Sequence, residues 1–579
     1  MSDDKAPANI KAALAAFDDT TREHIALALW MSEFEADEID PDILARLADA
    51  KNSPSAYGDR MRRYIRYLMD HPVSRTPSHN EIYKKLLPYC ENLSPQQSYV
   101  LQSSFLGPPS TVGYDWIPNR ADFKFPRDHL PKVRSKNGWH FFVGSCWDTE
   151  GNEYGVELMF FQAALFPPAV AAGLGLTDDE NQVVELQFAI SEAGGRHFQA
   201  EPVVLGGTSG LVGYDTDPFV YRLGRNTIQC HSNDGLLPVT VKAWGLDRGV
   251  DPSRQLGIDI TFSAGKQTLF QGANGCMPAV DGTGSLYYSI PNLQVDPACS
   301  TLVLDGKTIT LERGAFWFDH QWGHLAMVGR STVWRAAAFA RNPGPGGWDW
   351  FMAQFIEDRQ LTVFAPHGKQ YAAFYEQTGP TPPKTMTVDV AGTFMNSNGA
   401  TSLVNGALQI TDWVRADHSP NPDRYSVTDT WHPNEWKFQF DDSIPEDIRS
   451  FTMNPIVQGA QAGFFGNGAQ YAEGAVVLTS PNGDDLGRGF AESVSYANTR
   501  KNIHRLAGLP DSEEFIQALQ KRKVPLGLRL SNLLYLFTHR KEVNEIVDDS
   551  AGLEFFIGEQ LREHNRKRAA KQNRKAINP

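Results

Sequence analysis

The residues best suited to chemistry gather in one stretch, residues 314–324, with the sequence Gly-Ala-Phe-Trp-Phe-Asp-His-Gln-Trp-Gly-His. It combines aromatic rings with one carboxylate, Asp319, and with the imidazoles of His320 and His324. A site that holds an apolar molecule and moves a proton needs apolar walls beside an ionisable group. Aromatic strands are also common in protein cores, so a structural role for these residues stays open.

The stretch predicts a strand, because apolar and aromatic residues dominate it and no helix former recurs. Successive side chains of a strand point to opposite faces. The residues expected on one face are Phe316, Phe318, His320 and Trp322, and those expected on the other are Trp317, Asp319 and Gln321. Whichever face points inward therefore carries an ionisable group among aromatic rings.

The chemistry considered is the addition of water to an unactivated alkene, which requires an acid that stays protonated near neutral pH. Burial and a neighbouring carboxylate both raise the pKa of an aspartate, so Asp319 and Asp349 are predicted to act as a pair. His320 would orient water or accept its proton. The predicted catalytic residues are Asp349, His320, Asp319 and Glu492. For Asp319 the alternative is structural, because it could satisfy backbone groups at a barrel corner.

Aromatic faces would stabilise a carbocation by roughly 1–2 kcal/mol each when desolvated. The predicted substrate-binding residues are Trp317, Trp322, Trp348, Trp350, Phe318, Gln354, Tyr288 and Tyr496. Gln354 or Tyr496 would fix a hydroxyl or carbonyl group. In a regular strand, however, Asp349 faces away from both Trp348 and Trp350, so the three line one cavity only if a bulge intervenes.

Composition limits the class of protein. A chain of 579 residues exceeds one ordinary core, so two to four domains are expected. The net charge of −14 argues against a nucleic-acid binder, which needs a concentrated basic surface. We find neither an apolar run of membrane-spanning length nor signal-peptide features at the start. The five cysteines lack metal-ligand spacing and predict reduced thiols in a cytoplasmic protein.

Three familiar motifs are set aside. Gly306, Lys307 and Thr308 end like a phosphate-binding loop, but Thr301 stands where the first glycine belongs. The chain has no Gly-x-Ser-x-Gly nucleophile elbow. The spacing of His320 and His324 would suit a metal pair on a helix, whereas a strand is expected there. We therefore predict no metal and no cofactor.

The Trp-x-Asp-His-x-Trp-Gly pattern at 317–323 resembles the central motif of the carotenoid 1,2-hydratase, kievitone hydratase and AttH-like group. Further resemblances are the Trp-rich hairpin at 139–155, the Tyr-Tyr-Ser-x-Pro element at 287–291 and the Gly-x-Gly-aromatic-x-Glu run at 487–496. Together they extend from about residue 138 to 497. The resemblance implies a mainly β fold of two consecutive lipocalin-like antiparallel β-barrels, which the central motif joins.

The resemblance also implies that His320, Trp322 and Asp349 form the acid–base group. The group carries a tyrosine two positions before this aspartate, whereas this chain has Gly347, which argues against a carotenoid substrate. The implied activity is that of a cofactor-independent hydratase or dehydratase, acting on an apolar isoprenoid or prenylated molecule in a cavity between the barrels. The alternatives are an isomerase or cyclase of the same fold group and a non-catalytic carrier of an apolar ligand.

The predicted domains are a helical N-terminal domain (1–107), a first barrel (108–327), a second barrel (328–498) and a helical C-terminal extension (499–579). Residues such as Asp40-Pro41 and Ser94-Pro95 have the N-cap and proline that begin helices. The extension ends in a basic tail that is either a solvated end or a peripheral attachment to an anionic membrane. Substrate identity and oligomeric state are not predicted.

Overall fold

The structure is a computed structural model that describes the central part of the chain. The described residues are 121–496 without 165–167, 169–176, 201–202, 208–210, 248–253, 274, 278–283, 325–347, 367–380, 416–430, 458–461, 465–469 and 495. The predicted helical regions at both ends lie outside these residues, and so does the basic tail. Within the described part, no helix is long and apolar enough to cross a membrane.

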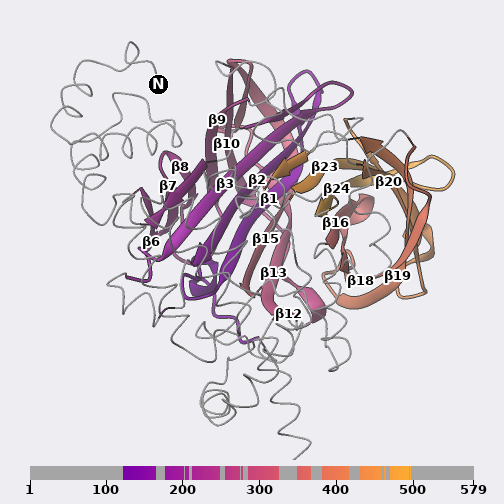
Figure 1. Cartoon of the computed structure of the whole chain (residues 1–579), viewed down its shortest axis with the longest axis horizontal. Helices are drawn as coiled ribbons and strands as arrows, with labels where there is room; N and C mark the ends of the chain where they lie inside the picture. Colours follow the sequence, from indigo (N-terminus) through magenta and orange to yellow (C-terminus); the bar gives the residue numbers. More distant parts are fainter. Residues whose placement is uncertain are drawn as a thin grey trace, which may run out of the picture.

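The first half of the described chain forms one large antiparallel sheet. Its strands are β1 (Asn137–Asp148), β2 (Glu153–Ala164), β3 (Gln182–Glu192), β4 (His197–Gln199), β5 (Val203–Gly206), β6 (Val212–Thr216), β7 (Phe219–Leu223), β8 (Asn226–Cys230), β9 (Val239–Leu246), β10 (Gln255–Ala264), β11 (Leu269–Phe270), β12 (Cys276–Met277), β13 (Gly284–Val295), β14 (Thr301–Leu304) and β15 (Lys307–His324). The main path runs β4-β3-β2-β1-β15-β13-β10-β9-β8-β7-β6. The central motif therefore occupies β15, in the middle of the sheet between β1 and β13 (Figure 1).

This sheet curls until its two arms enclose an aromatic core. The Tyr221 ring on β7 lies 5.4 Å from Phe160 on β2 and 5.5 Å from His140 on β1, measured between centroids. The two arms also meet at an isolated bridge between Ala200, which follows β4, and Asp247, which follows β9. The first half is thus a curled sheet. Among the described residues, its main path of paired strands runs from β4 to β6, and these two strands do not pair with each other.

The second half is a closed barrel of eight antiparallel strands, with β22 added at the edge of β23. Its strands are β16 (Trp348–Phe355), β17 (Arg359–Pro366), β18 (Met386–Met395), β19 (Thr401–Arg415), β20 (Trp431–Phe440), β21 (Ser450–Pro455), β22 (Ala462–Phe464), β23 (Gln470–Thr479) and β24 (Asp485–Val494). Pairing of β21 with β23 closes the ring. The prediction of a mainly β, antiparallel fold is confirmed.

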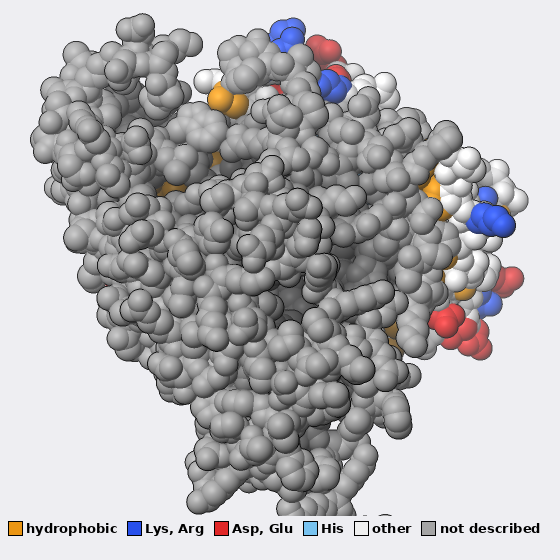
Figure 2. Space-filling view, viewed as in Figure 1, with side chains coloured by type: hydrophobic (Ala, Val, Ile, Leu, Met, Phe, Trp, Pro, Cys, Tyr) orange, Lys and Arg blue, Asp and Glu red, His pale blue; other side chains and the backbone are white. Residues whose placement is uncertain are grey.

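The alternation expected of half-buried strands is clear on the barrel. In β18, buried Met386, Val388 and Val390 alternate with exposed neighbours. The described surface of this half, at the right of Figure 2, carries acidic and basic side chains close together. In the same half, the largely buried Arg359 side chain pairs with Asp447, with 2.7 Å between nitrogen and oxygen.

The long strand β15 begins with a tight hairpin from β14. Asp305 and Gly306 form its two-residue turn with φ angles of 50° and 75°. Positive φ at both positions matches the twist of a hairpin, and Asp-Gly is a favoured sequence for it. Gly306 therefore serves a turn, in agreement with setting aside a phosphate-binding loop.

The halves meet along the outer faces of β1 and β2 on one side and of β23 and β24 on the other, which lie next to each other in Figure 1. Near one end, Arg488 Nε donates to Glu153 Oε1 at 2.6 Å. Gly155 allows the close approach of the sheets, because a Cβ there would overlap Ala475. At the other end, Lys266 Nζ lies 2.8 Å from Asp358 Oδ2. The contact surface between the halves is held at both ends.

Candidate active site

The two faces of β15 look into different surroundings, as its alternation predicts. Asp319 faces the second half, where Tyr287 and Ser289 donate hydroxyl hydrogen bonds to its carboxylate. Trp317 Nε1 donates to Asp319 Oδ1 at 2.6 Å. Across the boundary, Trp350 Nε1 on β16 donates to the Tyr287 hydroxyl at 3.0 Å. Asp319 therefore sits in a hydrogen-bonded network that joins the two halves.

Burial controls the charge of Asp319. The side chain is 5% exposed, and burial raises its pKa to about 7, against the lowering effect of the three donors Ser289, Tyr287 and Trp317. Burial and the nearby Asp319 also raise the pKa of Tyr287, so its phenol keeps its proton. Asp319 can thus exchange a proton near neutral pH.

A second acid, Glu492 on β24, lies at the same contact surface. In the strand registers it stands opposite Trp350 on β16 and opposite Glu473 on β23. Trp348 forms a hydrogen bond with its carboxyl group. Glu492 and the two tryptophans therefore share the outer face of the barrel, the face that meets the first half.

The surroundings of Glu492 favour its protonated form. Burial is the largest cause that raises its pKa to about 8, and the hydrogen bond from Trp348 opposes it. The negative charges of Glu157, Asp319 and Asp349 raise it further. Two predicted acids, Asp319 and Glu492, are thus brought near each other and hold protons near neutral pH.

Sequence reasoning missed two further carboxyl groups at this surface, Glu157 on β2 and Glu473 on β23. They are 2% and 5% exposed. Glu473 forms a hydrogen bond with Glu157, and burial, followed by the charges of Glu157 and Glu492, raises the pKa of Glu473 well above its ordinary value. The sequence does contain a feature that could have indicated them, because each glutamate lies in an otherwise apolar strand. Glu157 lies in Val-Glu-Leu-Met-Phe-Phe and Glu473 in Glu-Gly-Ala-Val-Val-Leu.

His320 lies on the opposite face of β15, inside the first half. Its ring stacks on His140, with 3.9 Å between centroids, and its Nδ1 donates to the Trp139 carbonyl at 2.7 Å. Burial, then the neighbouring His140 and Lys132, lower the pKa of His320 well below its ordinary value. The imidazole is therefore neutral at physiological pH and is held by the backbone.

Three predicted substrate-binding residues, Phe318, Tyr288 and Trp322, share this interior with His320. The Tyr288 hydroxyl lies 2.6 Å from His129 Nδ1, in the short turn η3 (Arg127–His129). Phe123 packs edge-on against both Tyr288 and Trp322, at 5.6 and 5.7 Å between centroids. The segment before β1 thus covers this end of the first half.

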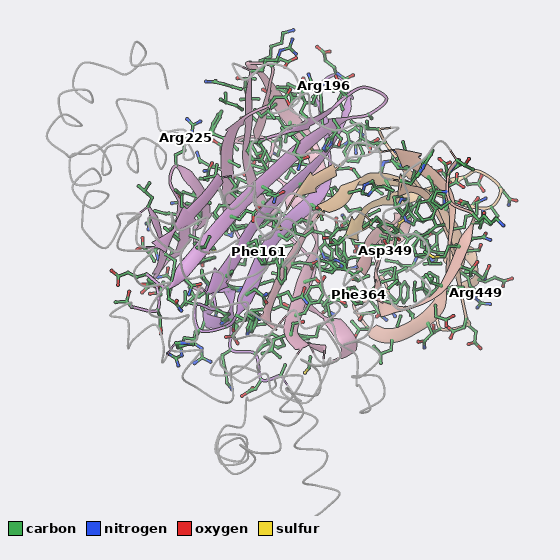
Figure 3. All side chains as sticks on the ribbon, in the orientation of Figure 1. Phe161, Arg196, Arg225, Asp349, Phe364 and Arg449 are labelled. Carbon is green, nitrogen blue, oxygen red and sulfur yellow. The ribbon has the colours of Figure 1, made fainter. Side chains whose placement is uncertain are left out.

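Asp349 lies inside the second barrel. The Tyr496 hydroxyl contacts its two carboxylate oxygens at 3.2 and 3.0 Å, and both residues are fully buried (Figure 3 labels Asp349). Trp413 packs against Tyr496 at 5.8 Å between centroids. The register of β16 is regular on both sides, so Asp349 and Trp350 face opposite ways, and no bulge brings them together.

The structure therefore distributes the predicted site residues over three places. Asp319, Glu492, Trp317, Trp348 and Trp350 face the contact surface, while His320, Phe318, Tyr288 and Trp322 lie inside the first half and Asp349 and Tyr496 inside the second. The predicted pair of Asp319 and Asp349 does not share a face, because strand parity turns Asp349 into the barrel.

Gln354 holds the halves together instead of presenting a free amide. Its Oε1 accepts from the Asn292 backbone N–H at 3.0 Å, and its Nε2 donates to the Ala315 carbonyl at 3.3 Å. No group of described residues has the arrangement of a metal site. The side chain of His324 lies outside the described part, and a strand separates it from His320 by about 13 Å.

The fold and the site define a class: a two-part antiparallel β protein whose halves meet across buried acids and tryptophans. A family model described as AttH-like matches residues 117–496, more than half of the chain. The chain belongs to the AttH-like family, as its central motif predicts. A search of curated proteins found no match.

A search of solved structures found further similar proteins. An AttH protein from Nitrosomonas europaea is 17% identical, with a TM-score of 0.47, over 66% of this chain and 100% of that one. Kievitone hydratase from Nectria haematococca is 13% identical, with a TM-score of 0.40, over 67% and 97% of the two chains. CghA with Sch210972 is 15% identical, with a TM-score of 0.33, over 66% and 94%.

Proposed function

We propose that the protein is a hydratase or dehydratase that works without a cofactor. It adds water to an alkene, or removes it from a tertiary alcohol, of an apolar isoprenoid or prenylated molecule bound between the halves. One observation carries the proposal: Asp319 and Glu492 face the same surface beside tryptophans, and their pKa values are raised to about 7 and about 8. Two acids are thus available near neutral pH in apolar surroundings.

The chemistry follows from those protonation states. One carboxylic acid donates its proton to the alkene carbon and becomes a carboxylate, which leaves a tertiary cation on the substrate. Faces of Trp350 and Trp348 stabilise the cation by roughly 1–2 kcal/mol each when desolvated. Water then forms the carbon–oxygen bond and releases a proton that restores the acid. Dehydration is the same sequence in reverse.

Asp319 and Glu492 suit the acid role better than His320 does. The His320 ring is neutral and its Nδ1–H is committed to the Trp139 carbonyl, so it is a weak proton donor. Asp349 faces the barrel interior, where Tyr496 holds it. We propose that His320 and Asp349 act by fixing the two cores that carry the contact surface.

The test compares D319N and E492Q with the unchanged chain on a panel of prenylated and terpenoid alkenes and tertiary alcohols. Loss of a general acid lowers turnover by roughly 100-fold or more. Circular dichroism and unfolding curves serve as the control for folding. If both variants convert substrate at the original rate, neither acid takes part and the proposal fails.

A further inference from the structure

Glu157, Glu473 and Glu492 form a group of three glutamates at the boundary between the halves. Glu473 on β23 and Glu492 on β24 stand directly opposite each other in the strand register. Glu157 reaches them from β2 of the first half. Like charges at opposite positions of neighbouring strands repel each other, and burial strengthens the repulsion. The group is therefore stable only if it carries protons.

A shared proton accounts for the contact between Glu157 and Glu473. Two carboxylates have no hydrogen to donate, so the hydrogen bond between them requires a proton on one of the two. Pairs of buried carboxyls that share one proton serve as acid and base in known enzymes. The pair carries one negative charge and can accept one more proton.

One oxygen of this pair lacks a partner. Glu473 Oε1 is fully buried and has no hydrogen-bond partner among the described residues. Buried polar atoms without a partner are rare in proteins and often mark a place where water or a ligand binds. The oxygen lies on the same outer face of the barrel as Glu492, the acid that stands opposite Glu473.

Acidic groups act on Glu473 and on its cross-strand neighbour Glu492. The charges that act on Glu473 come from Glu157 and Glu492, both acidic. Asp319 on β15 and Asp349 on β16 act on the neighbouring Glu492. Arg488, the nearby cation of β24, is committed to Glu153 and Asp485.

We propose that Glu473 is a further catalytic residue of this site: its Oε1 holds the water that adds to the substrate, and the Glu157–Glu473 pair takes the proton that this water releases. The inference rests on the proposed hydratase activity. It assigns the base, whereas Glu492 or Asp319 supplies the acid.

The proton balance closes within the group. Protonated Glu492 gives its proton to the alkene carbon and becomes a carboxylate. The water at Glu473 forms the carbon–oxygen bond to the cation and passes one proton to the pair, which then holds two. The pair returns one proton to its cross-strand neighbour Glu492, so the site regains its first state and the net reaction is the addition of one water.

The role of Glu473 is tested in the full chain by comparing two products, the deuterated alkene and the alcohol. The E473Q variant, with the alkene panel in heavy water (D₂O), should still protonate the alkene and lose a proton again. We expect deuterium in the recovered alkene, while alcohol formation falls 100-fold or more. E492Q should lower deuterium incorporation as well. Alcohol formation by E473Q at the original rate would overturn the proposal.

A second measurement needs no substrate. Infrared spectra at pH 7 should show the carbonyl stretch of protonated carboxyl groups, and part of this band should disappear in E473Q. E185Q is the matched control, because Glu185 is also buried and accepts a hydrogen bond from Gln187 on the same strand. If E473Q leaves the band unchanged, no proton is shared and the proposal falls, whatever the activity. If the unchanged chain converts no alkene but the band behaves as expected, the hydratase assignment fails and the catalytic role of Glu473 falls with it.

Discussion

The raised pKa of Asp319 has a consequence for stability that needs no substrate to measure. Burial raises this pKa from 3.8 to about 7. The native protein therefore keeps a proton that the unfolded chain loses at about pH 4, and stability falls as pH rises through the interval between these values. Above about pH 7 this loss of stability is complete. A shift of about three pKa units corresponds to a penalty of about 4 kcal/mol.

The variant D319N removes the titration and keeps the shape of the side chain. The amide oxygen can still accept from Trp317 and Ser289, which both donate to Oδ1, and the Tyr287 hydroxyl can turn to accept from the amide nitrogen. The free energy of unfolding, measured by urea at pH 5 and pH 9, should fall less with pH in D319N than in the unchanged chain. The two falls should differ by about 3 kcal/mol, because about two of the three pKa units of the shift lie between pH 5 and pH 7. Equal slopes would refute the reasoning, because Asp319 would then ionise alike in both states.

Three further predictions concern the same geometry. G155A should destabilise the protein by about 1–3 kcal/mol in urea unfolding, because the added methyl group overlaps Ala475 and forces the halves apart; an unchanged value would mean that the sheets are not in contact there. Y496F should lower the free energy of unfolding in urea by about 1–3 kcal/mol, since Asp349 loses its buried hydroxyl donor. A free energy of unfolding equal to that of the unchanged chain would contradict this contact. Turnover should fall as pH rises above about 8, where Glu492 loses its proton; a rate that keeps rising to pH 10 would exclude a carboxylic acid as the donor.

Local pattern predicted a good part of this structure. Alternation correctly separated Asp319 from His320 and Asp349 from Trp350, because side-chain direction in a strand depends only on position. The Trp-rich hairpin named at 139–155 is present, as strands β1 and β2 with a short turn between them. The central motif also indicated the family, which the match over residues 117–496 confirms.

The sequence could not show what covers each face. Both sides of β15 are aromatic, and only the arrangement of the two halves turns Asp319 toward Trp350 and His320 toward His140. Glu157 was not predicted as a site residue for the same reason. It interrupts an apolar strand that is buried on both faces, and its partner Glu473 lies in the other half, far along the chain. The commitment of Gln354 to two backbone groups of the first half is likewise a long-range contact.

The central claim is that acids at the surface between the halves add or remove water. Its most direct test is incubation of the full chain with the alkene and alcohol panel in water enriched in heavy oxygen, followed by mass spectrometry. The account predicts a product that gains one labelled water, or an alkene formed by loss of water, and a fall of 100-fold or more in D319N or E492Q. A product of unchanged mass would contradict it and indicate an isomerase or cyclase. A ligand bound and recovered unchanged would also contradict it and indicate a carrier.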